Sequence, residues 1–419
     1  MAKVFVKTFG CSLNQSDSEL MAGMLKKQGH ELTEEKDAEL IVINSCSVKQ
    51  SAEAKLMKEI KKHQGKKVVV AGCVPQAQPS YLKTKLKDIS VIGVNNLTEI
   101  DAAVSQTLEN NVYQNIQRQK TQRLNLPKVR KNPVIEIVPL NEGCLDNCSY
   151  CKTKHARGHL YSYAKEDIVE QAKTAIEDGC KEIWLTSQDT GCYGLDRNTS
   201  IVELLKELLN LRGYFKIRLG MMNPNYALQF LDELIEVYQH PKMFKFLHIP
   251  VQAGNNRILR LMKRRYTVEA YKTVVAAFKK AIPEITISTD VILGFPTETE
   301  EEFMDTYTLV KETKPEVLNI SRFWLRPNTE AVHMEQVHGQ ISKVRSEKMH
   351  LLFNDIVAAN NRQWLDWEGE ILIDDFGTNG FSIGRNDSYK QILIKDVALG
   401  DVLNVKITET TRFDLRAQR

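Results

Sequence analysis

The sequence of 419 residues contains no apolar run that approaches the roughly 20 residues needed to span a bilayer. Its start shows no basic segment followed by an apolar core and a small-residue cleavage site, and the strand-like run Val4–Val6 comes almost at once. The sequence also has no internal repeat and no low-complexity tract. These absences predict a cytoplasmic protein that does not associate with a membrane.

The chain lacks a strong charge of either sign, since 57 Lys and Arg against 53 Asp and Glu leave a net charge of only +4. This balance neither requires nor excludes nucleic acid as a partner, so local charge must decide. Hydrophobic residues make up 42% and charged residues 26%, as in ordinary globular proteins, and the length suits two or three domains. In a cytoplasmic protein, eight cysteines favour metal, cluster or catalytic ligands over disulfides.

Three cysteines, here called the loop cysteines, lie in one short segment with the spacing CxxxCxxC: Cys144, Cys148 and Cys151. No paired CxxC accompanies them at zinc-finger spacing, whereas a structural zinc site takes four ligands, usually as two pairs. A loop of this kind supplies three thiolates to a four-iron cluster and leaves one iron open for a small chelating ligand. Structural zinc and ordinary cytosolic thiols are the alternatives.

Residues 1–110 alternate strand-like apolar runs with helix-period segments, which predicts an α/β domain with a doubly wound parallel sheet. Three further cysteines, here called the sheet-edge cysteines, each follow the end of a predicted strand: Cys11, Cys46 and Cys73. Because the carboxyl ends of parallel strands meet at one edge, these thiols can converge on a second three-thiolate site. The alternative is three small buried hydrophobic residues in loops.

The middle of the chain divides into a connector and a large α/β domain. Residues 111–133 have weak periodicity, many bases and no acid, which predicts a basic linker that is either solvated or in contact with phosphates. Residues 134–356 contain six strand-helix units, which predicts a partial (β/α)6 barrel with its active site at the carboxyl ends of the strands.

The contexts of the loop and sheet-edge cysteines together resemble the methylthiotransferase family of radical S-adenosylmethionine (SAM) enzymes, over nearly the whole chain. The resemblance implies two 4Fe-4S clusters. The open iron of the loop cluster would be chelated by SAM, which makes the loop cysteines catalytic, and the auxiliary cluster on the sheet-edge cysteines would take part in supplying sulfur. An unidentified low-potential electron donor would reduce the loop cluster, and the resulting deoxyadenosyl radical would remove a hydrogen atom that no side chain can abstract.

The same resemblance suggests residues that contact SAM. Tyr150 would lie beside the adenine, unless it is only a packed loop aromatic, and Gln188 would accept a hydrogen bond from the amino group in place of the family's acid. Arg218 has the fork geometry to pair the SAM carboxylate, with a surface ion pair as the alternative. Gln252 and Gly294 lie in motifs that resemble the family's Pro-x-Gln and Gly-Phe-Pro turns. Thr297 replaces a glycine of that second turn and would be strained at positive φ.

A set of cations near the predicted barrel mouth suits RNA phosphates, and we single out Arg157, Arg264 and Arg265. The segment Lys152–Gly158 lacks the Ile-Pro or Val-Pro that bacterial members commonly carry before Arg-Gly. With Gly220–Pro224, it resembles the archaeal and eukaryotic branch that acts on N6-threonylcarbamoyladenosine at position 37 of tRNA. The predicted partner is therefore the anticodon arm of tRNA, with the target base turned out of its stack.

Two alternatives keep the chemistry and change the substrate, to isopentenyladenosine in tRNA or to a side chain of a ribosomal protein. A third alternative, from another class, is an RNA-binding protein with structural zinc on these cysteines.

Residues 357–419 contain short alternating runs with glycines at the turns, and the last predicted strand, near Val402–Thr408, is followed by a polar tail. This pattern predicts a small β-barrel, which resembles the RNA-binding TRAM domain of the same family. Acids slightly outnumber bases here, so RNA would need a local basic face, and a solvated barrel surface is the alternative.

Overall fold

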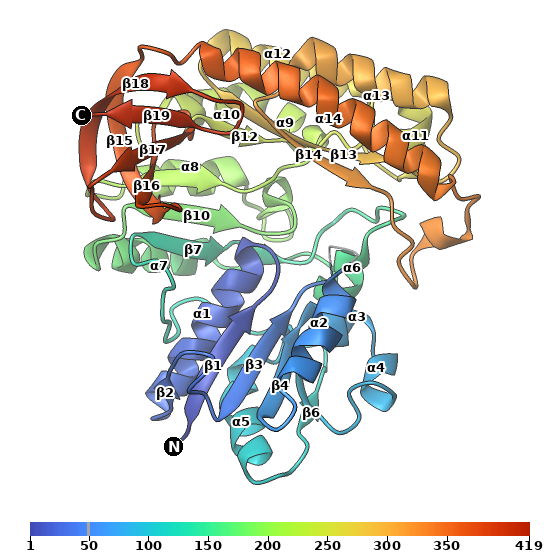
Figure 1. Cartoon of the computed structure of the whole chain (residues 1–419), viewed down its shortest axis with the longest axis vertical. Helices are drawn as coiled ribbons and strands as arrows, with labels where there is room; N and C mark the ends of the chain where they lie inside the picture. Colours follow the sequence, from blue (N-terminus) through green and yellow to red (C-terminus); the bar gives the residue numbers. More distant parts are fainter. Residues whose placement is uncertain (48–50) are drawn as a thin grey trace.

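The computed structural model describes residues 1–47 and 51–419, which form three parts in chain order. Figure 1 shows the N-terminal sheet and its helices in blue, the central partial barrel from green to orange, and the C-terminal barrel in red beside the central part. The overall class is α/β, as predicted. Within the described residues, no helix is long and apolar enough to cross a membrane.

The N-terminal sheet has six parallel strands in the order β2-β1-β3-β4-β5-β6. The strands are β1 (Lys3–Thr8), β2 (Glu31–Leu32), β3 (Leu40–Ser45), β4 (Lys67–Gly72), β5 (Ser90–Gly93) and β6 (Gln114–Asn115). Strand β3 is buried along its whole length because helices cover both faces of the sheet. Helices α1 (Ser12–Lys27) and α5 (Ile100–Leu108) share one apolar core with the sheet. Helices α2 (Ser51–Lys62) and α3 (Cys73–Ala77) pack on the other face, near the four-residue helix α4 (Ser80–Lys83), which confirms the doubly wound prediction.

The central part contains six parallel strands in two three-stranded sheets, which confirms the partial barrel. One sheet has the order β11-β10-β7 and the other the order β12-β13-β14, and an isolated bridge from Ile217 to Met243 joins them. The strands are β7 (Ile135–Pro139), β10 (Glu182–Thr186), β11 (Lys216–Leu219), β12 (Phe246–His248), β13 (Thr286–Leu293) and β14 (Val317–Arg322). Two short strands, β8 (Asn141–Glu142) and β9 (Tyr161–Ser162), pair with each other beside the mouth.

Helices cover the outside of the partial barrel, with their apolar faces in the largest core of the molecule. They are α7 (Lys165–Glu177), α8 (Ile201–Leu209), α9 (Pro224–Gln229), α10 (Leu231–Gln239), α11 (Asn256–Leu261), α12 (Val268–Ala281), α13 (Glu300–Thr313) and α14 (Gly339–Arg362). The short helix α6 (Lys152–Arg157) instead packs against α3 of the N-terminal part. Helix α11 ends at Leu261, and Lys263 shortly after it has φ +58°, in the left-handed region. The side chain of Arg264 is therefore free to turn away from the helix axis.

The C-terminal part is a closed barrel of five antiparallel and parallel strands in the order β15-β16-β17-β19-β18. They are β15 (Glu368–Phe376), β16 (Phe381–Arg385), β17 (Gln391–Lys395), β18 (Val402–Thr410) and β19 (Leu415–Gln418). The polar tail of the prediction is in fact β19, which pairs with both β17 and β18 and buries Leu415 at 1% exposure. The predicted boundary after residue 356 lies inside α14, which continues to Arg362.

The loop between β16 and β17 attaches this barrel to the central one. Its Asp387 carbonyl accepts a hydrogen bond from the Lys245 amide at 2.6 Å, and its Ser388 carbonyl accepts one from Thr286 Oγ1, also at 2.6 Å. The ring of Tyr389 packs edge-on against Phe244, with 4.7 Å between centroids. Because β12 and β13 begin here, the loop covers the amino-terminal end of the partial barrel.

The bases of the predicted basic linker fall into two groups. Arg123 is buried, and its Nη1 lies 2.6 Å from Asp17 Oδ1 and 3.0 Å from Glu142 Oε1. Lys128 Nζ lies 2.6 Å from Oε1 of Glu136, a carboxylate that also pairs with Arg130. These three bases neutralise acids on α1, β7 and β8 and so attach the segment to the N-terminal sheet and the partial barrel, whereas the other three are exposed: Arg118, Lys120 and Lys131.

Candidate functional site

The loop cysteines lie between β8 and α6. Gly143, with φ +68°, starts the loop, and a side chain there would overlap the His159 carbonyl oxygen. The Cys151 amide donates to the Cys148 carbonyl at 3.0 Å, and the Asp146 amide donates to Cys144 Sγ at 3.3 Å. These hydrogen bonds fix the backbone of the short loop that carries the three thiols.

The end of α11 holds this loop from the barrel side. Ser149 Oγ donates to the Leu261 carbonyl at 2.7 Å, and the Ser149 amide donates to the Met262 carbonyl at 3.1 Å. Both carbonyls are left without helical partners where α11 ends, so Ser149 satisfies them. The early end of α11 thus provides the acceptors that position the loop.

The guanidinium of Arg264 lies against the loop cysteines. Its Nη1 donates to Cys148 Sγ at 3.1 Å, its Nε donates to the Tyr266 hydroxyl at 2.9 Å, and its Nη2 donates to Asn223 Oδ1. Asn223 Nδ2 in turn donates to Asp146 at 2.8 Å and to Asp189 at 2.6 Å. We predicted a phosphate contact for Arg264, and the structure instead places its charge against the sulfur of Cys148.

The surroundings shift the pKa values of the loop thiols in different directions. Burial raises the pKa of Cys148 to about 11, although the charge of Arg264 opposes this, and burial also raises the pKa of Cys151. A hydrogen bond from Cys192 lowers the pKa of Cys144. A metal centre on these residues must displace their protons, as thiolate ligation requires.

Two residues beside the loop, Asp189 and Cys192, were not predicted as site residues. The ligand atoms of Cys144, Asp189 and Cys192 all lie within 4.8 Å of one another, which is close enough for one metal ion. Asp189 and Cys192 are fully buried in the turn after β10, and burial raises the pKa of Asp189 to about 7. The position of Cys192 just after the Gln188 turn was the one sequence signal. This set and the loop cysteines share Cys144.

The sheet-edge cysteines converge as the strand order predicts. The thiols of Cys11 and Cys73 each donate to Asn14 Oδ1 at 3.7 Å, and a side chain on Gly10 would lie 3.0 Å from Cys46 Sγ. Cys46 and Cys73 are buried, while Cys11 is exposed. Burial raises the pKa of Cys73 to about 12.

The two cysteine sets lie on either side of one short helix. Helix α6 begins directly after Cys151, and α3 begins at Cys73, and these helices pack side by side (Figure 1). Ala156 shares a small buried cluster with Cys73 and Ala77. A helix of six residues is about 9 Å long.

On the barrel side, Ser12 Oγ lies 3.1 Å from Thr186 Oγ1 at the end of β10, so both sets border the mouth of the barrel.

Several predicted SAM contacts also border this mouth. Gln188 Oε1 is buried and has no hydrogen-bond partner among the described residues, which leaves an acceptor for an ammonium group. Tyr150 packs edge-on against Phe295, with 6.2 Å between ring centroids, which brings it to the Gly294 turn. A side chain on Gly294, at φ +70°, would overlap Ser342 Oγ. Gln252 has φ +68° and accepts a hydrogen bond from the Ile292 amide at 2.9 Å. The orphaned acceptor fits SAM in this place.

Comparisons with known proteins give the same three-part organisation. Residues 3–93 match the uncharacterized protein family UPF0004, residues 138–310 match the radical SAM superfamily, and residues 368–418 match the TRAM domain. A threonylcarbamoyladenosine tRNA methylthiotransferase of Drosophila melanogaster is 42% identical, over 99% of this chain and 77% of that protein. The human protein of the same name is 41% identical, over 99% of this chain and 74% of that protein. The chain belongs to the radical SAM methylthiotransferase family.

An archaeal member of the family, from Pyrococcus horikoshii, is named a probable threonylcarbamoyladenosine tRNA methylthiotransferase and is 38% identical, with 97% of each chain covered. Among solved structures, the radical SAM methyltransferase TsrM of Kitasatospora setae has a TM-score of 0.56 at 14% identity, with 79% of this chain and 75% of that chain covered. At this identity the likeness concerns the fold. Membership of the radical SAM family implies SAM and one 4Fe-4S cluster.

Arg218, a predicted SAM contact, and Arg157, a predicted RNA contact, have other neighbours than those expected. The guanidinium carbon of Arg218 lies 4.9 Å from the Trp184 ring, 5.0 Å from Phe246 and 5.2 Å from Tyr389 of the C-terminal barrel. These cation–π contacts place Arg218 at the junction of the two barrels, so its position does not support the predicted pairing with the SAM carboxylate.

Arg157 is buried at 3% exposure, which contradicts its predicted contact with RNA phosphates. Its Nη2 lies 2.6 Å from Asp17 Oδ2, and its Nη1 lies 3.1 Å from Glu142 Oε2, so two carboxylates neutralise it. Its Nη2 also donates to Asn14 Oδ1 at 3.3 Å, beside the sheet-edge cysteines. Arg265 is different, because 59% of its side chain is exposed and it makes only a 3.4 Å ion pair with Asp146.

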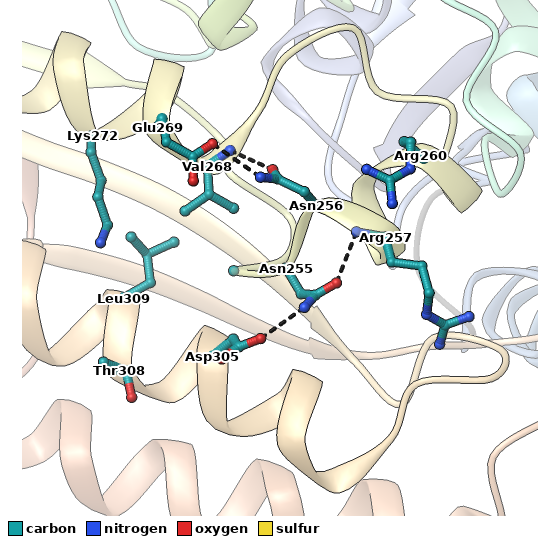
Figure 2. Close-up of a pocket in the computed structure, with 11 residues that line it drawn as sticks. Asn255, Asn256, Arg257, Arg260, Val268, Glu269, Lys272, Asp305, Thr308 and Leu309 are labelled. Atoms are coloured by element: carbon teal, nitrogen blue, oxygen red, sulfur yellow. Dashed lines mark hydrogen bonds between the residues drawn. The ribbon is translucent and has the colours of Figure 1, made fainter.

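A separate cavity of about 500 Å³ lies on the outside of the barrel, between α11, α12 and α13 (Figure 2). Figure 2 shows Asn255 bonded to Asp305 and Asn256 bonded to Glu269 across it, at 2.7 Å and 3.0 Å. No predicted site residue lines this cavity. The candidate site is therefore the mouth between the two cysteine sets.

Proposed function

We propose that this chain is a two-cluster enzyme that adds a methylthio group to C2 of N6-threonylcarbamoyladenosine at position 37 of tRNA. The observation that carries the proposal is that α6, which directly follows the loop cysteines, packs against α3, which begins at the sheet-edge Cys73. The substrate is that named for relatives about 40% identical over nearly the whole chain. A tRNA substrate also agrees with action in the cytoplasm.

The residues have separate tasks. The loop cysteines hold one 4Fe-4S cluster, and the sheet-edge cysteines hold the second. The orphaned Gln188 Oε1 accepts from the SAM amino group, while Tyr150, Gln252 and the Gly294 turn bind the rest of SAM. When bound, the clusters and SAM supply hydrogen abstraction and sulfur, chemistry that side chains alone cannot perform. A low-potential electron donor, as yet unidentified, provides the electron.

The tRNA must reach the mouth with its anticodon arm. Arg265, exposed beside the loop cysteines, is the remaining predicted phosphate contact, and the C-terminal barrel, which matches the TRAM domain, supplies a second surface. The barrel mouth accepts the modified base once it leaves its stack.

Metal and nucleoside analyses test this proposal together. Anaerobically purified protein should contain about eight irons per chain, as two four-iron clusters require. Mass spectrometry of tRNA nucleosides from a deletion strain should show loss of the methylthio form of threonylcarbamoyladenosine, with restoration by the intact gene. Unchanged nucleosides contradict the substrate, and loss of methylthiolated isopentenyladenosine or of a modified ribosomal protein would identify the alternative one.

A zinc site is the second candidate, because Cys144, Asp189 and Cys192 can hold one ion. Cys192→Ser separates the two possibilities. On our proposal the variant keeps its iron, whereas a zinc protein would lose zinc and contain no iron in either form.

A further inference from the structure

Arg264 donates a hydrogen bond to a loop sulfur, that of Cys148, while Arg326 acts electrostatically on Cys151. All three guanidinium nitrogens of Arg264 have partners, namely Cys148 Sγ, Asn223 Oδ1 and the Tyr266 hydroxyl. The guanidinium carbon also lies 4.9 Å from the centroid of the Tyr266 ring. The side chain is therefore held in one orientation, with Nη1 directed at the sulfur.

The partners of Arg264 are themselves fixed by the barrel. The Tyr266 hydroxyl lies 2.9 Å from the Val251 carbonyl, to which it donates while it accepts from Arg264. Asn223 is buried, and its amide nitrogen donates to Asp146 and Asp189. The orientation of Arg264 thus depends on turns that follow two different barrel strands, β11 and β12.

In the part of the chain that the structure describes, no acid forms a direct ion pair with Arg264. Asp146 and Asp189 accept hydrogen bonds from Asn223 Nδ2, and the carboxylate of Asp189 offsets the charge of Arg264 only across Asn223. A guanidinium stays protonated at all working pH values. In a partly buried site, a permanent positive charge acts strongly on a neighbouring group.

We propose that Arg264 is a positioning residue that raises the reduction potential of the cluster held by the loop cysteines. Hydrogen bonds to ligand sulfurs and nearby charge are two of the features that set cluster potentials. Reduction adds negative charge, so a cation and an N–H donor at Cys148 Sγ stabilise the reduced form. Because of Arg264, a weaker reductant can reduce the cluster. This inference rests on the proposed function, since it needs a cluster at this place.

Redox titration of the anaerobic holoenzyme, followed by EPR and without SAM, measures this effect. Arg264→Met should move the potential of the loop cluster to a more negative value by about 59 mV, which is a tenfold change in the one-electron equilibrium constant. Arg264→Lys should shift the potential less than Arg264→Met does, because lysine keeps the positive charge but lacks the forked donor geometry of the guanidinium. The matched control is Arg260→Gln on α11, whose exposed charge is screened by solvent and should leave the potential unchanged.

Asn223→Ala tests the support of Arg264 separately. It removes the acceptor of Nη2 and should shift the potential in the same direction by less than Arg264→Met does. In the Arg264→Met background it should add no shift, since the two residues act as a unit. If Arg264→Met loses its iron, Arg264→Lys and Asn223→Ala still give the answer.

The outcomes separate this inference from the proposed function. An unshifted potential in Arg264→Met with full iron content overturns the inference, and weaker SAM binding at an unshifted potential does so too, because Arg264 would then bind the SAM carboxylate. A wild-type protein without any cluster signal overturns both the inference and the proposed function.

Discussion

The two cysteine sets are built in opposite ways. The loop cysteines come from one continuous segment, which Ser149 fastens to the end of α11. The sheet-edge cysteines come from three separate strand ends, and the sheet alone brings them together. The first site can form wherever its loop is held, whereas the second depends on the register of a whole domain.

Their neighbouring cations differ as well. Arg157, beside the sheet-edge cysteines, is neutralised by Asp17 and Glu142, whereas Arg264, on Cys148, has no carboxylate partner among the described residues. The same residue type therefore joins two domains in one place and acts on a sulfur in the other. The difference shows that burial and partners, rather than residue type, decide what an arginine does.

The largest effect is expected from substitutions that remove one cluster and leave the other in place. Cys144→Ala and Cys73→Ala should each abolish methylthiolation in nucleoside analysis and leave about four irons of about eight, because each variant loses one four-iron cluster. Cys180→Ala, in the core and away from both sets, is the control that keeps all iron. If Cys73→Ala retained eight irons, the sheet-edge cysteines would not be ligands.

The second largest expected effect is a difference in the free energy of unfolding between variants of Arg157, which is buried, and Arg265, which is largely exposed. Arg157→Met should destabilise the protein by about 3–5 kcal/mol in urea unfolding, since it leaves the two buried carboxylates of Asp17 and Glu142 with Arg123 as their one remaining cation among the described residues. Arg265→Met removes a largely exposed pair and should cost about 0–1 kcal/mol. Equal losses in the two variants would contradict the buried ion cluster.

A smaller effect changes the spacing between the sites. Ala156 is fully buried between α6 and α3, so Ala156→Leu should overpack the contact, at a cost of about 1–3 kcal/mol, and push the helices apart. The magnetic interaction between the reduced clusters should weaken in EPR spectra. Ala175→Leu, in the buried face of α7, should cost a similar amount and leave that interaction unchanged.

The smallest effect concerns backbone strain. Glycines at positive φ precede both Cys11 and Cys73, whereas the barrel turn after Gly294 has Thr297 at φ +65°. Thr297→Gly should therefore stabilise the protein by about 1 kcal/mol in urea unfolding. Thr299→Ala, which removes the cap of α13, should destabilise it by about the same amount. A loss of stability in Thr297→Gly would mean that the hydrogen bond from Arg257 Nη1 to Thr297 Oγ1 outweighs the strain.

The sequence predicts much of this molecule because its signals are local or periodic. The spacing of the loop cysteines, the alternation of strands and helices and the placement of cysteines at strand ends need no knowledge of side-chain contacts. The strand β19 escaped notice because it has only four residues, half of them polar, which are held by closure of the barrel rather than by a periodic pattern.

The roles of the arginines depend on long-range packing and could not be predicted. Arg157 and Arg264 both look like exposed bases near a barrel mouth, yet one meets Asp17 and the other meets Asn223, each distant in sequence. Arg218 faces Tyr389, which belongs to a different part of the chain. Partners of this kind follow from the docking of domains, which no window of sequence reveals.

The attachment of the C-terminal barrel has a consequence for the whole reaction chamber. The loop with Tyr389 packs against the residues that lead into β12 and β13, so it shields the amino-terminal end of the partial barrel from solvent. A domain expected to bind RNA therefore also covers the end of the barrel that lies opposite the cysteines, in an enzyme whose reactive radical must be kept from water.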